Sequence, residues 1–322
     1  MQVLVLAGGL SAERDVSLRS GRRVAEALRI ERPDWEVQEH DVDAALLERL
    51  RSHRPDCIVP LLHGAAGEDG ALRNVLESLR IPFVGSGAAA SRLAFDKPIA
   101  KQLAETSGIS TPACVAMPQS TFRELGAAAV LDAVVESVGL PLVVKPTKGG
   151  SSLGTSIVHR AEDLPAAMVG AFAYGDVVLM ERFVSGIEVS VSVFERAGDV
   201  LALSAVEIVP EGELYDYAAR YTAGTTEFFC PARLSDEEAL AAQAMALDVH
   251  VLLGLRDWSR TDMIIDADGV AWFLEVNVAP GMTETSLLPQ ALAAAQITVG
   301  ALVADLVQRT VGLPSPPSAD AT

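Results

Sequence analysis

Residues 260–277 read RTDMIIDADGVAWFLEVN, and this stretch predicts the part of the fold that carries the chemistry. Two β-rich apolar runs flank the Asp-Gly pair at 268–269, which is typical of a two-residue type I′ turn. Alternation along each strand then places four side chains on one face of a hairpin: Asp262 opposite Glu275 and Arg260 opposite Asn277. The stretch therefore predicts a β-hairpin that carries two opposed carboxylates.

Two carboxylates directly opposite each other repel, and a hard cation between them would remove the repulsion. Asp262, Glu275 and Asn277 all offer oxygen ligands, which suit Mg²⁺ or Mn²⁺ shared with substrate phosphates. The alternative is a solvated strand face on which Arg260 forms a salt bridge. The spacing favours the metal site slightly and leaves both interpretations open.

Composition excludes several classes of protein. The chain has 322 residues, half of them apolar, which suffices for one large domain or two to three small ones. A net charge of −18 argues against a nucleic-acid partner, because phosphate backbones need a basic face. No apolar run reaches membrane length. Cys57, Cys114 and Cys230 are far apart and are predicted to be reduced thiols in a cytoplasmic protein.

The first ninety residues alternate between apolar strands and amphipathic helices. Strands are predicted at 2–9 and 56–64, with a further strand in WEVQEHDV and a short one in PFVGSG, and this alternation predicts a parallel sheet. Such sheets bind ligands at the carboxyl ends of their strands. Three polar segments follow strands here: GGLSAERDVS, HGAAGEDG and GSGAAAS.

The pattern changes near residue 95. Two helices, the second over about 121–138, precede short strands, and antiparallel strands follow from about 186. A further helix opens with a capping box formed by Ser235 and Glu238. We therefore expect four parts, which are an α/β domain over 1–94, an α+β domain over 95–185, an antiparallel domain over 186–312 and a disordered tail over 313–322.

The glycine-rich segment KPTKGGSSLG, residues 145–154, allows several interpretations. It contains G-x-S-x-G, but a strand rather than a helix follows, so a nucleophile elbow centred on Ser152 is disfavoured. Lys145 precedes the glycines, which is the wrong order for a P-loop. The remaining interpretation is a β-hairpin flap whose serines and backbone N–H groups fold over a triphosphate.

Four isolated residues have both a functional and a structural interpretation. Glu13 could bind an ammonium group or cap a helix, and the cap is favoured from the residue alone. His63 could line a site or be a hydrogen-bonded structural residue, and Tyr221 could be a site hydroxyl or a surface aromatic. Lys97 could lie on the surface, whereas Lys145 ends an apolar run and is expected to be placed for function. GSGAAA only half matches a dinucleotide fingerprint, so an NAD site is not expected.

Seven motifs in order resemble the D-alanine–D-alanine ligases of the ATP-grasp superfamily, over about residues 2–310. They are LAGGLSAERDVSLRSG, LHGAAGEDG, GSGAAASRLAFDK, VVKPTKGGSSLGTS, ERFVSGIEVSV, YDYAARYTAGTTEFFCPA and RTDMIIDADGVAWFLEVNVAPGMTETSLLP. The resemblance implies three domains around a cleft, with ATP gripped between the middle and C-terminal domains.

The resemblance also implies a role for each matching residue. For ATP it implies Lys97 and Lys145 at the phosphates, Glu181 and Glu188 at adenine and ribose, the backbone of Arg182, Phe183 and Val184 at adenine, and Arg220 near the γ-phosphate. For two Mg²⁺ or Mn²⁺ ions it implies Asp262, Glu275 and Asn277. For the first D-alanine it implies that Glu13 binds the ammonium group with His63 nearby, and that Ser151 and Tyr221 form a hydrogen-bonded set with Glu13. For the reacting carbonyl it implies an oxyanion site made by Arg260 and the Gly281 N–H. For the second D-alanine it implies that Ser286 and the Leu287 N–H bind the carboxylate.

The activity implied is ATP-dependent joining of two D-alanines through an acylphosphate, for peptidoglycan precursor synthesis by a cytoplasmic homodimer. The alternative is a related carboxylate–amine or D-Ala–D-lactate or D-Ser ligase of specialised metabolism or resistance. Three positions depart from the family pattern, because Arg220 replaces a common lysine, Gly149 an acidic residue, and NVAPG the usual N-T-x-P-G. A tyrosine at 221 goes with an amine acceptor in the resembling enzymes, which favours a dipeptide product.

Overall fold

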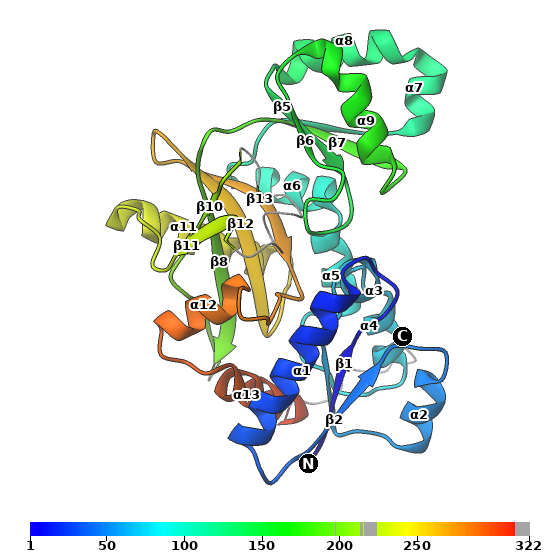
Figure 1. Ribbon diagram of the computed structural model, residues 1–322, viewed down its shortest axis with the longest axis vertical. Coiled ribbons are helices and arrows are strands. Elements are labelled where there is room, and N and C mark those ends of the chain that lie inside the picture. The colour runs from blue at the N-terminus through cyan, green and yellow to red at the C-terminus, as the bar shows by residue number, and fades with distance from the viewer. Residues whose placement is uncertain (197, 213–214, 216–223, 313–322) are drawn as a thin grey trace.

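The computed structural model describes residues 1–196, 198–212, 215 and 224–312. Within them the chain forms three β-sheets, stacked along the long axis of the molecule and flanked by helices (Figure 1). The strands are β1 Gln2–Ala7, β2 Glu36–Asp41, β3 Cys57–Pro60, β4 Cys114–Pro118, β5 Leu142–Pro146, β6 Ser156–Val158, β7 Val177–Arg182, β8 Gly186–Arg196, β9 Asp199–Ala202, β10 Val206–Pro210, β11 Thr226–Phe229, β12 Trp258–Asp266 and β13 Ala271–Asn277.

The first sheet has the order β2-β1-β3, and its strands run parallel, as predicted. Four helices alternate with these strands or follow them: α1 Arg14–Glu31, α2 Leu46–Ser52, α3 Ala65–Glu68 and α4 Ala71–Ser78. The carboxyl ends of β1 and β3 are joined by Ser17, whose Oγ accepts from the Gly8 N–H at 2.7 Å and donates to the Leu61 carbonyl at 2.7 Å. The strand predicted at PFVGSG is wrong, because Phe83 makes only an isolated bridge to Ile58.

The second sheet is antiparallel, with the order β4-β7-β5-β6. Helices α7 Gln119–Leu125, α8 Ala127–Val138 and α9 Leu164–Phe172, with the short turn η1 Ala161–Asp163, pack on it at the top of Figure 1. The single helix predicted over 121–138 is wrong, because Gly126, with φ +86°, separates α7 from α8. A left-handed backbone at this position interrupts the helical hydrogen bonds.

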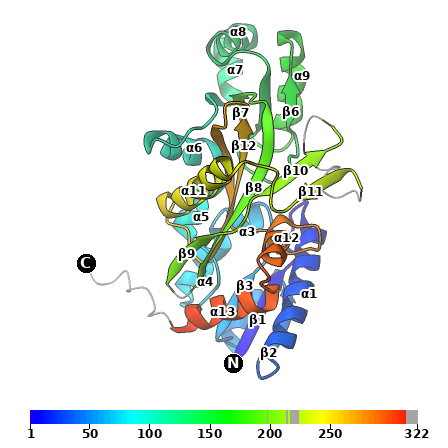
Figure 2. The ribbon, with the colours of Figure 1, turned by 90° about the vertical axis from the view of Figure 1, so that its left-hand side faces the viewer.

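The third sheet has the order β11-β10-β8-β12-β13, with β9 paired to β8. Helix α11 Asp236–Leu252 covers one face, where its Ala242 and Ala246 pack on Val191 and Met263 (Figure 2). The predicted capping box is confirmed, because the Ser235 side chain accepts from the Glu238 N–H while the Glu238 carboxylate accepts from the Ser235 N–H.

The hairpin of β12 and β13 keeps its predicted pairing but not its predicted turn. The two-residue turn is wrong, because Asp266 pairs with Val270 around a three-residue loop in which Gly269 has φ +77°. This loop shifts the register by one residue, and a bulge between Asp262 and Met263 shifts it back. As a result Asp262 still faces Glu275, as predicted.

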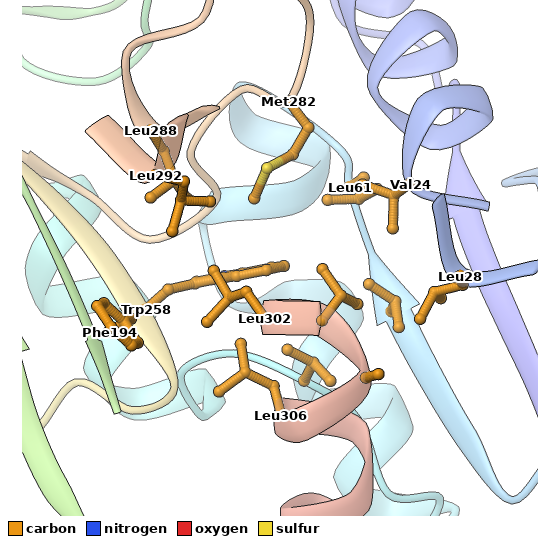
Figure 3. Close-up of a cluster of buried hydrophobic side chains, with 14 of the residues drawn as sticks. Val24, Leu28, Leu61, Phe194, Trp258, Met282, Leu288, Leu292, Leu302 and Leu306 are labelled. Atoms are coloured by element: carbon orange, nitrogen blue, oxygen red, sulfur yellow. The ribbon is translucent and has the colours of Figure 1, made fainter. Parts of the chain in front are cut away.

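One hydrophobic cluster joins the first and third sheets (Figure 3). It packs Val24 and Leu28 of α1 and Leu61 against Leu302 of α13 Val299–Gly312, with Trp258 of β12. Helix α12 Leu287–Ala294 adds Leu288 and Leu292 from the side of the third sheet. The C-terminal helix therefore shares its core with the N-terminal sheet, although the two lie at opposite ends of the chain.

Helices α5 Ala88–Phe95 and α6 Lys97–Thr106 lie between the predicted first and second domains. Ala94, Ala100 and Ala104 pack against Phe273 and Val276 of the third sheet. Hydrophobic clusters are shared between the sheets in this way, so the structure does not by itself divide the chain at residues 94 and 185. These domain boundaries stay a prediction. Among the described helices no single one is long and apolar enough to cross a bilayer, and only α12 and α13 taken together, bent by 101°, reach that length and composition.

Candidate active site

A cavity of about 430 Å³ lies between the second and third sheets. Its walls come from β5, β6 and β7 on one side, from β8, β10, β12 and β13 on the other, and from the glycine-rich segment after β5. Nine of the predicted site residues line it: Lys97, Lys145, Glu181, Arg182, Phe183, Val184, Glu188, Asp262 and Glu275. The fold thus brings together residues that are up to 178 positions apart, from 97 to 275.

Glu181, at the end of β7, is held between two lysines. Its Oε1 forms an ion pair with Lys145 Nζ, and its Oε2 lies 2.8 Å from Lys101 Nζ. Burial alone would raise the pKa of the Glu181 carboxyl, but the two lysines lower it below its usual value. The same attraction raises the pKa of Lys145 despite the burial of its amine. This wall of the cavity therefore carries fixed charges.

The opposite wall carries the two carboxylates of the hairpin. Asp262 Oδ1 accepts from Ser190 Oγ at 2.7 Å, and both Asp262 oxygens accept from Arg260, at 2.8 and 2.7 Å. Glu275 Oε2 forms an ion pair with Lys97 Nζ at 2.9 Å. Lys97 also donates to the Gly149 carbonyl at 2.8 Å, so one lysine joins the hairpin to the glycine-rich segment.

The two serines of the glycine-rich segment point to different parts of the protein. Ser151 Oγ donates to Glu13 Oε1, which lies directly before α1 of the N-terminal domain. Ser152 lines the cavity and donates to the Tyr215 carbonyl at 2.9 Å. Glu13 is the N-cap residue of α1, and its carbonyl accepts from the Ser17 N–H at 3.0 Å, but its side chain makes no hydrogen bond to the helix. The predicted capping position is therefore correct, while the carboxylate itself is turned to Ser151.

Glu13, His63, Glu68 and Arg260 form a second polar cluster beside the flap. A Cβ atom on Gly64 would lie 2.9 Å from Glu13 Oε2, so the loop after β3 approaches Glu13 closely. Burial raises the pKa of the Glu68 carboxyl to about 8, and the charge of Glu13 adds to the rise. Burial also lowers the pKa of His63 to about 4, with a smaller contribution from Arg260.

His63 is a neutral, hydrogen-bonded residue in this structure. Its Nδ1 lies 3.0 Å from the Ala279 carbonyl, which can only accept, so Nδ1 carries the proton. Its Nε2 then accepts from Ser20 Oγ at 3.3 Å, and the same Oγ accepts from the Met282 N–H at 3.1 Å. His63 therefore ties the loop after β3 to the segment after β13.

That segment, residues 278–287, contains the predicted Gly281, Ser286 and Leu287. A Cβ atom on Gly281 would lie 2.7 Å from Ser286 Oγ, so a side chain at this position would displace the Ser286 hydroxyl. Ser286 Oγ accepts from the Thr283 N–H at 3.0 Å, and Leu287 begins α12. Asn277 Oδ1 accepts from the Ala279 N–H at 2.8 Å. These contacts fold the segment into a compact loop directly after β13.

Two predicted residues, Arg220 and Tyr221, lie outside the described residues. Sequence reasoning missed Lys101, which completes the arrangement around Glu181 and contributes no side chain to the cavity lining. Its spacing from Lys97, four residues on one helix, was the available signal. Tyr215 and the β10 residues Ile208, Val209 and Pro210 of the cavity wall were also missed, because nothing in their sequence indicates chemistry.

The donor set of the hairpin fits a hard divalent cation. Asp262 and Glu275 oppose each other and line the same cavity. Asn277, two residues further along β13, does not line it, and its amide oxygen accepts from the Ala279 N–H with one lone pair and keeps the other for an ion. Within the described part of the chain no three His, Cys, Asp or Glu side chains cluster closely enough to hold an ion alone. The set therefore suits an ion that takes its remaining ligands from phosphate and water.

Two antiparallel sheets that enclose a cavity beneath a glycine-rich flap define the ATP-grasp fold. The crystal structure of a D-alanine–D-alanine ligase from Bacillus anthracis matches with a TM-score of 0.80 and 30% identity over 97% of both chains. A second structure of that protein, described as complexed with ATP, matches with a TM-score of 0.79 at 28% identity and covers 97% of both chains.

Residues 103–308 match the family model described as the D-ala D-ala ligase C-terminus. The chain is 42% identical to a D-alanine–D-alanine ligase from Nitrosospira multiformis over 307 residues, 94% of each protein. It is 38% identical to a ligase of the same name from Pelotomaculum thermopropionicum, over 96% of each. The chain therefore belongs to the D-alanine–D-alanine ligase family, as its sequence motifs predicted.

Proposed function

We propose that this chain joins two D-alanine molecules to D-alanyl-D-alanine, with conversion of ATP to ADP and phosphate, for peptidoglycan precursor synthesis. Family membership supports the reaction, and the geometry of one cavity supports it independently. Lys97 and Lys145 line that cavity together with the carboxylates of Glu181, Asp262 and Glu275, and Lys97 is ion-paired with Glu275 and Lys145 with Glu181. Lysines and carboxylates gathered in one pocket of this size suit a triphosphate that binds with a divalent cation.

We assign the nucleotide to this cavity. Lys97 and Lys145 supply positive charge for the phosphates, and Glu181 and Glu188 supply acceptors for adenine and ribose. The adenine ring lies against the backbone of residues 182–184 in this proposal. Asp262, Glu275 and Asn277 would hold two Mg²⁺ or Mn²⁺ ions, which would neutralise charge on the phosphates. Lys97 and Arg260, which pair with the two carboxylates, would then share these partners with the ions.

The first step activates a carboxylate, which is a poor acyl donor because oxide is a poor leaving group. The carboxylate oxygen of the first D-alanine attacks the γ-phosphorus of ATP, and the bond to the bridging oxygen of ADP breaks. Lys145 and Lys97 stabilise the charge that develops on the transferred group. Glu13 binds the ammonium group of the same D-alanine, and Ser151 fixes the Glu13 carboxylate by a hydrogen bond.

In the second step the neutral amine of the second D-alanine attacks the carbonyl carbon of the acylphosphate, the C–O bond to phosphate breaks, and the proton that the amine loses leaves with the phosphate. Arg260 uses Nε and Nη2 to bind Asp262, while its Nη1 makes no hydrogen bond to the described residues. We assign this Nη1 and the Gly281 N–H to the oxyanion, where a good donor contributes about 3–4 kcal/mol. Ser286 Oγ and the Leu287 N–H would bind the carboxylate of the second D-alanine at the start of α12.

The identity of the acceptor is the finer part of the proposal. A crystal structure described as a D-Ala:D-Ser ligase from Enterococcus faecalis matches with a TM-score of 0.80 at 25% identity, covering 96% of this chain and 99% of that one. This fold therefore accommodates a second acceptor. Sequence identity near 40% to D-alanine–D-alanine ligases favours D-alanine as the acceptor of this chain. We also propose a homodimer in the cytoplasm, on the family resemblance.

One assay tests the proposal. The purified protein is supplied with ATP, Mg²⁺ and D-alanine, phosphate release is followed, and the product is identified by mass. We expect phosphate release that depends on D-alanine and a dipeptide product. Equal concentrations of D-serine or D-lactate are then offered in competition. A failure of D-alanine to stimulate phosphate release would refute the ligase assignment, whereas a mixed dipeptide or depsipeptide as the main product would refute only the acceptor.

A further inference from the structure

Lys101 is a fully buried lysine that the reaction as described does not use. It lies on α6 with 1% of its surface exposed and contributes nothing to the lining of the cavity. Its Nζ lies 2.8 Å from Glu181 Oε2 and donates to the Phe273 carbonyl at 3.3 Å. One ammonium group therefore joins β7 of the second sheet to β13 of the third, the two sheets that enclose the cavity.

The Phe273 carbonyl stands at the bulge of the hairpin. The register shift falls between the pairs Asp262–Glu275 and Met263–Phe273, so Leu274 is the extra residue. Leu274 and Glu275 both line the cavity, although neighbours on a regular strand point to opposite faces. The bulge therefore decides whether Glu275 reaches the cavity, and Lys101 and Thr111, whose Oγ1 donates at 2.9 Å, hold the carbonyl beside it.

Stability does not explain a second lysine at Glu181. Lys145 already neutralises this carboxylate, so Lys101 adds a buried charge without a carboxylate of its own. Burying an ammonium group costs free energy, and apolar replacements of buried ion pairs are often neutral or stabilising. What a second lysine does provide is orientation. With Lys145 on Oε1 and Lys101 on Oε2, the plane of the Glu181 carboxylate is fixed from both sides.

We propose that Lys101 is a positioning residue for the nucleotide, acting through Glu181 and through the Phe273 carbonyl. An ionised carboxylate has about four lone-pair sites, so two lysines do not use all of them, and Glu181 lines the cavity. With its plane fixed, Glu181 accepts a hydrogen bond from the 6-amino group of the adenine and repels a 6-oxo group. This inference rests on the proposed function, because it takes the cavity to be the ATP site.

The test compares ATP with inosine triphosphate, whose base has a 6-oxo group in place of the 6-amino group and a proton on N1; because the test compares each variant with the wild type, the N1 difference is common to both proteins. Dissociation constants are measured by titration calorimetry with Mg²⁺ for the wild type and Lys101→Met. We expect Lys101→Met to weaken the binding of ATP about tenfold, which corresponds to the loss of one hydrogen bond to a charged group. The affinity for inosine triphosphate should change by about twofold at most. If Lys101 had a purely structural role, its replacement would weaken the binding of both nucleotides by the same factor.

Two further variants separate the contacts of Lys101. Thr111→Val removes the other donor to the Phe273 carbonyl without touching Glu181, and we expect it to leave the preference for ATP within about twofold of the wild type. In a Glu181→Gln background, Lys101→Met should have no further effect on that preference, because the carboxylate through which it acts is gone. If Lys101→Met does not fold by circular dichroism, the comparison is made with Lys101→Gln.

An unchanged preference for ATP in a folded Lys101 variant would overturn the inference, and so would full additivity with Glu181→Gln. Wild-type protein that binds neither nucleotide would instead refute the proposed function. The two failures are therefore distinguished by the wild-type titration alone.

Discussion

Ser151 and Glu13 are 138 residues apart in the chain and are joined by a hydrogen bond in which the serine hydroxyl donates to the carboxylate. Ser151 belongs to the glycine-rich segment after β5, whereas Glu13 directly precedes α1 of the N-terminal sheet. Both side chains are buried. The contact therefore closes the flap over the site and orients the residue that we assign to the first D-alanine.

Replacing Ser151 with alanine should lower kcat/KM for D-alanine about 10–100-fold, the loss of one charge-assisted hydrogen bond in the substrate-bound state. The affinity for ATP should stay within about twofold, since Ser151 does not line the cavity. Steady-state kinetics and titration with ATP measure the two effects. Ser152→Ala is the matched control, because Ser152 has the same left-handed backbone and its hydroxyl donates to the Tyr215 carbonyl, whereas that of Ser151 donates to Glu13. Equal losses in both variants would assign the effect to the flap and not to Glu13.

Exchanging Glu275 for glutamine should lower kcat about 1,000-fold, because it removes a carboxylate from the proposed metal set and several kcal/mol of charge stabilisation. The fold should persist, since Glu275 is half-buried and its partner Lys97 also has the Gly149 carbonyl. Phosphate release and circular dichroism check both points. Glu237→Gln, on the exposed first turn of α11, serves as the control. Near-normal turnover in Glu275→Gln would remove this residue from the metal site.

The Glu68 carboxyl predicts a specific dependence of stability on pH. Its pKa is raised from the ordinary 4.5 of a glutamate to about 8 in the folded protein, so between these two pH values the folded state holds a proton that the unfolded state has lost. The stabilisation is complete below about pH 4.5 and is lost as pH rises through about 8. Glu68→Gln, which resembles the protonated form, should flatten this decline.

Urea denaturation at pH 5, 6, 7 and 8 measures the effect, with Glu48→Gln on the exposed face of α2 as control. The midpoints of the wild type and of Glu68→Gln should converge toward pH 5 and separate toward pH 8. Parallel curves for the two proteins would show that Glu68 is ionised throughout this range.

Arg309 of α13 should contribute strongly to stability. Its guanidinium donates to Glu195 of β8 and to Asp257, which is fully buried and also accepts from the Gly85 N–H at 2.6 Å. Arg309→Met removes one of the positive charges that neutralise the buried Asp257 carboxylate, and this loss should lower the free energy of unfolding by about 3–5 kcal/mol. Arg160→Met, which breaks only exposed ion pairs to Glu162 and Asp163, should cost less than about 1 kcal/mol. Similar urea midpoints for the two variants would contradict the argument.

The same contacts set a second pH dependence. Burial opposes ionisation of Glu195, but hydrogen bonds from His250 and Arg309 lower its pKa to about 2. The stability from this carboxylate is therefore present above about pH 4.5 and is lost as pH falls through about 2. The difference in unfolding free energy between the wild type and Glu195→Gln should accordingly be largest near neutral pH and should shrink in acid. A difference that stays constant from pH 7 to pH 2.5 would exclude this role for Glu195.

Local signals in the sequence predicted much of the architecture. Strand–helix alternation indicated the parallel sheet, and the Ser235–Glu238 pair indicated the start of α11, because these patterns depend on neighbours in the chain. Prediction failed at two positions where the backbone departs from the secondary structure that the residue pattern suggested. Gly126 interrupts what resembled one helix, and the segment at Phe83 makes one bridge in place of a strand.

The hairpin over residues 260–277 contains both a feature that the sequence predicted and one that it did not. Counting from an assumed two-residue turn paired Asp262 with Glu275 correctly, but only because a three-residue loop and a bulge cancel each other. Side-chain chemistry at 262 and 275 was readable from the residues. The bulge was not, because the Phe273 carbonyl beside it is held by Lys101 and Thr111, which come from segments far away in the chain.

The sequence by itself determined the residue types of the site, their order along the chain and the family to which the chain belongs. Motif order suffices for this, since each motif is a short run whose chemistry does not depend on folding. The family resemblance implied that Ser151 and Glu13 pair, and the structure shows this hydrogen bond. Only the tertiary structure decided that Lys97 pairs with Glu275 and Lys101 with Glu181. The physical reason is that charge and hydrogen bonding act over a few ångströms in space, whatever the separation along the chain.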